Sequence, residues 1–454
     1  MILAIGHRAT ILACLALAAS GIEGWNGDLA PITWTYNECR VPCENPESMI
    51  EHTSSRSRKA LLLPVYVPTV LLSLAQGLLL PTLPLYALDF DVSYLVASLV
   101  IAAAGIGTLL ADVPAGMLLG RLGLKPTMLI GAGLVAVATF ALGFAQFVPE
   151  LIVYRLIAGV GTAMWGLSRH AFITESIHPS ERGRAISVFG GINRIGMFGG
   201  PALGGLVGAT LGLRASFFVA GALCLVALAI SLKYVKDTRV QTHSERHVRW
   251  GIVREVIRLN GRDLAAAGIA QTFAQMIRSG RQTLIPFYGV SILGPSAAQI
   301  GTIQSASSLV DMALFIPAGI LMDRYGRKVA AVPSFAVMAI GMALIPFTNS
   351  FLTLLLVAML IGLGNGLGSG TMMTLGADLA PPGATGEFLG LWRLIGDTGQ
   401  AGGPLVVGSL TDALGFEASA FILAGTGIAS SVILARLVKE TRIAPVAATP
   451  GPAP

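Results

Sequence analysis

Residues 113–125 read Val-Pro-Ala-Gly-Met-Leu-Leu-Gly-Arg-Leu-Gly-Leu-Lys, and residues 316–328 read Ile-Pro-Ala-Gly-Ile-Leu-Met-Asp-Arg-Tyr-Gly-Arg-Lys. The second stretch starts 203 positions after the first (316 against 113). The same spacing relates further pairs: Gly159 and Gly362, Gly161 and Gly364, Glu175 and Asp378, Pro179 and Pro382, Gly183 and Gly386, and Gly199-Gly200-Pro201 and Gly402-Gly403-Pro404. One spacing kept at so many positions predicts two copies of a single structural unit.

The composition indicates that both copies lie in a membrane. Of the 454 residues, 54% are hydrophobic and 12% are charged, and the mean hydropathy is +0.74. A soluble chain carries about 25% charged residues. This chain therefore has too few charges to cover a water-facing surface, which excludes a soluble multi-domain enzyme. The apolar residues run through nearly the whole length, which also excludes a disordered chain.

Apolar stretches long enough to cross a bilayer, about 20 residues each, divide the chain into spans. The pattern predicts an all-α membrane protein with twelve transmembrane helices in two pseudo-symmetric six-helix bundles. The predicted helices cover residues 60–87, 94–119, 126–147, 150–176, 185–211, 215–235, 264–291, 297–322, 329–347, 351–377, 387–411 and 418–436. The predicted domains are an N-terminal extension (1–58), a first bundle (59–236), a basic linker (237–262), a second bundle (263–438) and a tail (439–454).

Basic residues in short loops indicate the cytoplasmic side of a membrane protein. The opposite set of loops holds Arg214 alone. We therefore expect both termini and the central linker to be cytoplasmic, in a bacterial inner membrane, and we attribute the net charge of +6 to orientation rather than to nucleic-acid binding. The loops on the predicted cytoplasmic side carry Arg56, Arg58, Lys59, Arg121, Lys125, Arg182, Arg184, Arg239, Arg246, Arg249, Arg254, Arg258, Arg262, Arg324, Arg327, Lys328, Lys439 and Arg442.

The first 58 residues do not fit the repeat. Residues 1–20 resemble a signal peptide but are too short to span, and residues 21–51 are polar without periodicity. We interpret this extension as poorly structured, or as the product of a start codon placed upstream of the true start at Met49.

The two quoted stretches resemble a loop signature of the major facilitator superfamily, a family of transporters, and the resemblance extends over roughly residues 60–440. The resemblance implies that these loops lock the cytoplasmic faces together in the outward-facing state. The first copy has Gly120 where the family has Asp, so the lock would depend on Asp323, whose carboxylate can meet the N-terminus of a helix in the other bundle. Plain orientation by basic residues is the alternative. The expected gating positions are Gly116, Arg121, Gly123, Lys125, Glu175, Gly319, Asp323, Arg324, Gly326, Arg327, Lys328 and Asp378.

Two helices carry further family-like motifs. In the fourth, Arg155 precedes Gly159 and Gly161, and the resemblance implies a role in proton coupling for the arginine and close contact with the first helix for the glycines. A structural arginine that bonds backbone carbonyls is the alternative. The fifth helix resembles the signature of the drug:proton antiporter branch, with simple helix packing as the alternative. Its motif residues are Gly196, Gly200, Pro201, Gly204 and Gly205.

Charged residues inside a bilayer normally face the protein interior and indicate function. Here the charges away from the helix ends fall on six of the predicted helices and are absent from the third, sixth, ninth and twelfth, which the resemblance places outermost. Arg278 and Arg281 either pair with Asp311 or bind anionic groups of a substrate. Arg393 and Asp397 are four apart and can pair with each other. The expected substrate and proton pathway consists of Asp112, Arg155, Arg194, Arg278, Arg281, Asp311 and Asp397, with Asp311 as the favoured proton site.

Other chemistries find no support in the sequence. No Gly-Lys pair occurs, so a phosphate-binding loop and ATP use are not expected. The four cysteines lack the paired spacing of a zinc site or a disulfide framework, and we expect no metal, cofactor or catalysis. The sequence predicts a monomeric secondary active transporter that moves a small organic solute, through proton-coupled efflux. The alternatives are uptake of an organic anion or metabolite and, more distantly, a membrane-embedded enzyme or receptor.

Overall fold

The computed structural model describes residues 62–176, 182–235, 246–294 and 296–441. The predicted N-terminal extension, Met49, the first part of the linker and most of the C-terminal tail lie outside the described residues. The side chains of residues 173–189 also lie outside them, so the predicted gating role of Glu175 has no structural counterpart to report.

The first bundle contains six helices. A π-helical turn (Leu62–Tyr66) leads into the first of them, and a short 3-10 turn (Leu142–Phe144) extends the third. The helices are α3 (Val67–Leu88), α4 (Tyr94–Leu122), α5 (Leu124–Ala141), α6 (Val148–Ser176), α7 (Arg182–Leu211) and α8 (Leu213–Tyr234).

The second bundle repeats this order. Its fourth helix is broken into α12 and α13, and its last two helices form one continuous element, α14, which contains a non-helical residue at Gly415. The elements are α9 (Arg246–Tyr288), a π-helical turn (Gly289–Leu293), α10 (Ala297–Tyr325), α11 (Arg327–Leu344), a 3-10 turn (Ile345–Phe347), α12 (Phe351–Leu367), α13 (Thr371–Leu379) and α14 (Thr385–Arg436).

Twelve membrane-crossing helices follow from this description, and the predicted fold class is confirmed. Within the described residues, nine elements are long and apolar enough to cross a bilayer. One of these is α14, which consists of two successive helices and crosses twice. The crossings missing from that set are α7 and α9, which carry Arg194, Arg278 and Arg281 in their middle.

The repeat seen in the sequence recurs in the packing. A Cβ on Gly161 would lie 2.6 Å from the carbonyl oxygen of Gly131, and a Cβ on Gly364 would lie 2.9 Å from that of Ser334. The spacing of 203 residues relates Gly161 to Gly364 and Gly131 to Ser334. The turns follow the same rule, because Gly123 (φ +88°) and Gly326 (φ +114°) adopt a backbone conformation that side chains with a Cβ rarely reach.

Two elements differ from the sequence prediction. Helix α9 begins at Arg246, inside the predicted linker, because residues there form an amphipathic surface turn in which Val253 is buried and Arg254 and Glu255 are exposed. The predicted helix 351–377 is interrupted between Leu367 and Thr371, where Gly370 has a φ of +77°.

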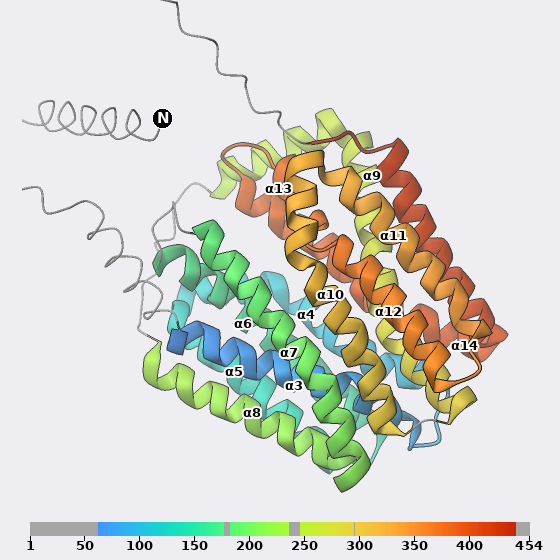
Figure 1. Cartoon of the computed structure of the whole chain (residues 1–454). Helices are drawn as coiled ribbons and strands as arrows, with labels where there is room; N and C mark the ends of the chain where they lie inside the picture. Colours follow the sequence, from blue (N-terminus) through green and yellow to red (C-terminus); the bar gives the residue numbers. More distant parts are fainter. Residues whose placement is uncertain (1–61, 177–181, 236–245, 295, 442–454) are drawn as a thin grey trace, which may run out of the picture. The chain divides into compact units, whose positions relative to one another are not determined.

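Figure 1 shows the two bundles, with α7 and α10 neighbouring each other along their boundary. The second pair of helices that joins the bundles is α4 and α14. We call the end that holds the turns at Gly123 and Gly326 the basic face, and the end that holds the turns at Gly212 and Gly415 the opposite face.

Candidate functional site

A cavity of about 650 Å³ lies between the two bundles. Its wall combines apolar side chains such as Leu79, Ile101 and Met197 with amides such as Gln76 and Gln275. Five charged side chains line it: Arg155, Arg194, Arg278, Arg281 and Asp311. All five belong to the pathway predicted from the sequence, and the structure brings them together in one site. The predicted pathway residues Asp112 and Asp397 do not line the cavity.

One ion pair joins the two bundles across this cavity. Arg194 Nη1 on α7 lies 2.7 Å from Asp311 Oδ1 on α10. The second carboxylate oxygen accepts a hydrogen bond of 2.9 Å from the amide of Asn365. Arg194 also donates to the hydroxyl of Ser369, and its guanidinium lies 4.7 Å from the ring centroid of Phe315. Asp311 is therefore fully engaged, and the strongest contact it makes is with the other bundle.

Arg278 and Arg281 have neutral partners instead of Asp311. Arg278 donates to the backbone oxygen of Gly368 (2.9 Å), and Arg281 donates to the hydroxyl of Ser307 (3.3 Å). Neither forms an ion pair among the described residues, so the alternative of direct pairing with Asp311 has no support in the structure. The reason is geometric, because Arg194 from the other bundle already occupies that carboxylate.

Arg155 lies on α6 and lines the cavity from the first bundle. Within the described residues it makes no hydrogen bond or ion pair, and its Nε is both inaccessible and unpartnered. The interpretation as a structural arginine that bonds backbone carbonyls therefore has no support in the structure. The resemblance implied that the neighbouring glycines contact the first helix, but they pack against other helices. Gly159 packs against Ala104 of α4, and Gly161 packs against Gly131 of α5.

The glycines of α7 make the contacts with the first helix instead. A Cβ on Gly200 would lie 2.5 Å from the Cα of Gly77 in α3, so the two backbones touch. Gly204 packs against Leu78 in the same way. Gly205 faces the other bundle, where a Cβ would lie 3.0 Å from the Cα of Gly301.

A second cluster of charged side chains joins α4 and α14 outside the cavity. Arg393 lies 3.4 Å from Asp112 of the other bundle and 3.4 Å from Asp397 of its own helix. The predicted pairing within the helix is therefore present, and the contact with Asp112 was not predicted. Arg169 and His170 on α6 also face Arg393.

The bundles are in contact at the opposite face. Asp412 of α14 accepts hydrogen bonds from the backbone N–H groups of Tyr94 (2.9 Å) and Leu95 (2.8 Å) at the start of α4. On the other pair of helices, the hydroxyl of Ser305 donates to the backbone oxygen of Phe198 (2.8 Å). These contacts join the bundles on the opposite-face side of the cavity.

Near the basic face, α4 and α10 each have a glycine with open space beside it. A Cβ on Gly116 or Gly319 would meet nothing within 4 Å. Their neighbours Val113 and Ile316, which are equivalent in the repeat, are 64% and 70% exposed. The close contacts between the bundles, such as Gly205 against Gly301 and Gly408 against Ser98, lie on the opposite-face side of the cavity, and we interpret the conformation as open toward the basic face.

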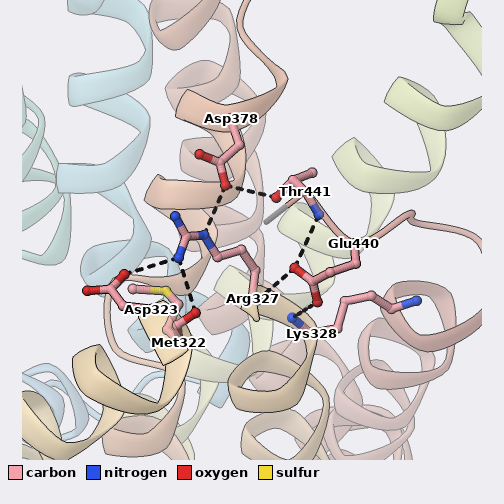
Figure 2. A network of polar contacts seen from close by, with 7 residues as sticks. All are labelled: Met322, Asp323, Arg327, Lys328, Asp378, Glu440 and Thr441. Atoms are coloured by element: carbon pink, nitrogen blue, oxygen red, sulfur yellow. Dashed lines mark hydrogen bonds and ion pairs between the residues drawn. The ribbon is translucent and has the colours of Figure 1, made fainter. Parts of the chain in front are cut away.

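At the basic face, four predicted gating residues of the second bundle form a network with Glu440 (Figure 2): Asp323, Arg327, Lys328 and Asp378. Arg327 donates to Asp378 (3.0 Å) and to Asp323 (3.1 Å). Glu440 accepts from the backbone N–H groups of Arg327 (2.8 Å) and Lys328 (3.0 Å). Asp323 thus bonds within its own bundle in this conformation. In the first bundle, Arg121 and Gly123 sit at an exposed turn, with Lys125 beside them.

Four residues that shape these sites were not singled out from the sequence. Asn365 and Ser369 lie inside the alternating glycine run of residues 362–370, and a polar residue within such a run was a usable signal. Asp412 and Glu440 stand near helix ends with no pattern that relates them to the distant helices they cap. The described residues contain no cluster of His, Cys, Asp or Glu that could hold a metal ion.

A family model described as Major Facilitator Superfamily matches the chain over residues 66–279 and 264–453. An MFS-type transporter of Methanocaldococcus jannaschii is 22% identical over 353 residues, which is 77% of this chain and 91% of that protein. The multidrug resistance protein MdtH of Aeromonas hydrophila is 25% identical over 312 residues, 63% of this chain and 72% of that protein. The synaptic vesicular amine transporter of Mus musculus is 25% identical over 66% of this chain, and the match spans 58% of that protein's length.

Solved structures share the fold. The D-xylose-proton symporter superposes with a TM-score of 0.69 at 17% identity, over 84% of this chain and 98% of that chain. A human organic anion transporter superposes with a TM-score of 0.62 at 19% identity, over 83% of this chain and 99% of that chain. At these identities the likeness concerns the fold alone.

Proposed function

The chain belongs to the Major Facilitator Superfamily, and from that premise we propose that it is a secondary active transporter that exports a small organic solute in exchange for protons. It is a multi-pass membrane transporter, and the finer points of direction, coupling and substrate are our proposal. The observation that carries the proposal is the cavity between two equivalent bundles, which hydrogen bonds of Asp412 join on the opposite-face side. Alternating access needs such a central site and two ends that can open in turn.

Export is the direction we propose on two grounds. The glycine and proline motif of α7 resembles the signature of the antiporter branch, and its close packing against α3 and α10 fits a helix that moves between neighbours. The relative MdtH is named as a multidrug resistance protein. In our proposal the basic face is cytoplasmic, the membrane is the bacterial inner membrane, and the chain acts as a monomer without ATP or a cofactor.

Proton coupling would use one of three carboxylates within the spans. Asp311 belongs to the ion pair that joins α7 and α10 across the cavity. Asp112 and Asp397 share Arg393 at the α4–α14 boundary. Protonation at either place would remove a charge from a contact between the bundles, so proton binding and bundle movement would be linked.

Proteoliposomes with a pH gradient of either sign test this proposal. A panel of labelled organic anions, cations and neutral solutes is offered to vesicles with an acidic or an alkaline lumen. An antiporter accumulates its solute when the lumen is acidic, because protons that leave drive the solute in. Accumulation only with an acidic exterior would reverse the direction of coupling, and no gradient-driven movement of any probe would contradict the proposal.

A second candidate, uptake of an organic anion, is favoured by one observation. The cavity carries four arginines against a single aspartate. In that case the chain would be a proton symporter, and the alkaline-lumen vesicles in the same experiment would accumulate the anion.

A further inference from the structure

We propose that the cavity binds an organic anion with two separated negative groups on an apolar body, whichever direction the transporter works. This inference rests on the proposed transport function and names its substrate class. It starts from the charges on the cavity wall, which are four arginines and one aspartate, a formal excess of three positive charges.

The ion pair between the bundles accounts for only one of these arginines. Asp311 is held by Arg194 at 2.7 Å, and Asn365 occupies its other oxygen. The partners of Arg278 and Arg281 are a backbone carbonyl and a hydroxyl, which carry no charge. Arg155 has no hydrogen bond or ion pair among the described residues. Asp311 also acts on Arg278 and Arg281 at longer range, but one carboxylate cannot neutralise four guanidinium groups, and the formal excess of three positive charges remains.

The burial of these guanidinium groups costs free energy unless an anion binds beside them. A charge removed from water needs a partner of opposite sign, and an arginine offers a rigid fork of donors that matches a carboxylate, sulfonate or phosphate. The Nε atoms of Arg155, Arg278 and Arg281 are inaccessible and unpartnered. Arg281 as a whole is only 9% exposed.

The positions of these arginines suggest two binding points. Arg155 lies on α6 in the first bundle, while Arg278 and Arg281 lie three residues apart on α9 in the second. A ligand with two negative groups can therefore contact both bundles at once. The apolar part of the wall, with Leu83, Ile101 and Met197, would receive the body between these groups.

An organic cation such as an amine fits this cavity poorly. Asp311 is the only described carboxylate on the wall, and its two oxygens are already engaged. An anion also suits the proposed export, because a membrane potential that is negative inside drives one negative charge outward with about 2.3 kcal/mol per 100 mV.

Binding of two related dyes to the purified full-length protein tests the inference. Carboxyfluorescein is an organic anion, and a cationic rhodamine shares its ring system but carries the opposite charge. Fluorescence anisotropy should detect saturable binding of carboxyfluorescein that weakens as salt is added, and no comparable binding of the rhodamine. Binding of the rhodamine alone, or of neither dye, would overturn the inference.

Variants locate the site. Arg278→Gln and Arg281→Gln should each weaken carboxyfluorescein binding about tenfold, the effect expected for one charge-assisted hydrogen bond. Arg262→Gln, on the exposed part of the same helix α9, is the matched control and should bind like the parent. Size-exclusion chromatography checks that each variant is folded.

Asp311→Asn keeps the test decisive if an arginine variant does not fold. It removes the single negative charge on the wall, so the anion should bind more tightly than to the parent. Weaker or unchanged binding would overturn the inference. Gradient-driven transport of a cation with no binding of the anion would also reject this substrate class while leaving the proposed transport function intact.

Discussion

At the scale of single residues, the charges in the membrane could be predicted, and so could the pair within one helix, Arg393 and Asp397, but the partners on other helices could not. The helices that carry charge are those that border the cavity or the boundary between the bundles, as the spacing of charged residues along the chain predicted. Which side chains meet depends on how helices from different bundles face each other. Arg194, and not Arg278 or Arg281, forms the ion pair with Asp311, and no spacing in the sequence indicates this choice of partner.

Asp311→Asn tests the role of this carboxylate in coupling. The amide keeps the shape of the side chain but cannot bind or release a proton. We expect exchange of solute down its own gradient to continue, while accumulation driven by pH falls to the level of empty vesicles. Vesicle flux, normalised to the amount of protein in the membrane, measures both.

The same variant separates coupling from stability. If the ion pair served stability alone, the loss of Asp311 would leave Arg194 unpaired at a cost of about 3–5 kcal/mol, and little protein would reach the membrane. A variant present at the parent level with full pH-driven accumulation would transfer the proton role to Asp112 or Asp397.

At the scale of elements, the glycines of α7 permit contact between helix backbones. Gly200→Ala should destabilise the protein by about 1–3 kcal/mol, because the new Cβ would lie 2.5 Å from the Cα of Gly77. Gly199→Ala is the matched control, since its Cβ would lie 3.6 Å from the nearest atom of Leu74. Thermal unfolding of the purified variants measures the difference. Equal midpoints for the two would contradict this close packing.

The start of α11 depends on Glu440, which accepts two backbone N–H groups there (Figure 2). Glu440→Gln removes the negative charge from the positive end of the helix, and we expect a loss of about 0.5–2 kcal/mol of stability. Glu255→Gln is the control, because among the described residues Glu255 pairs only with Arg258, at the exposed surface. If both variants melt like the parent, Glu440 has no capping role.

Apolar stretches of membrane-spanning length made the helices predictable, and the repeat related the two bundles and their equivalent turns at Gly123 and Gly326. The interruption between α12 and α13 was harder to predict, although the alternating glycine run that causes it can be seen in the sequence. A run of alternating glycines is compatible with close packing and with a broken helix, and only the left-handed Gly370 decides between them. The helical start of α9 was missed because its surface position leaves its residues polar.

At the scale of the whole molecule, the contacts between the bundles are uneven. The opposite face is held by Asp412, whose carboxylate caps the N-terminus of α4 from the other bundle. These bonds must break if the opposite face opens. Asp412→Ala should therefore increase the population that is open at the opposite face, roughly five- to thirtyfold for a loss of about 1–2 kcal/mol.

The reaction of an introduced cysteine with a membrane-impermeant maleimide measures that population. The residue for labelling is Ser98, which is fully buried beneath this contact and becomes accessible only when the bundles separate there. Ser98→Cys should react faster in combination with Asp412→Ala than with Glu417→Gln, an exposed acid on the same face. Equal rates in the two backgrounds would show that Asp412 does not hold the opposite face closed.

Distances between spin labels at the two faces test alternating access most directly. One pair replaces Met117 and Ile320 at the basic face, and the other replaces Leu211 and Leu414 at the opposite face. All four side chains are exposed, and each pair is related by the repeat. When the pH is lowered or a transported solute is added, we predict that the first distance shortens while the second lengthens in the same fraction of molecules. Two distances that stay fixed under every condition, or that lengthen together, would contradict the account.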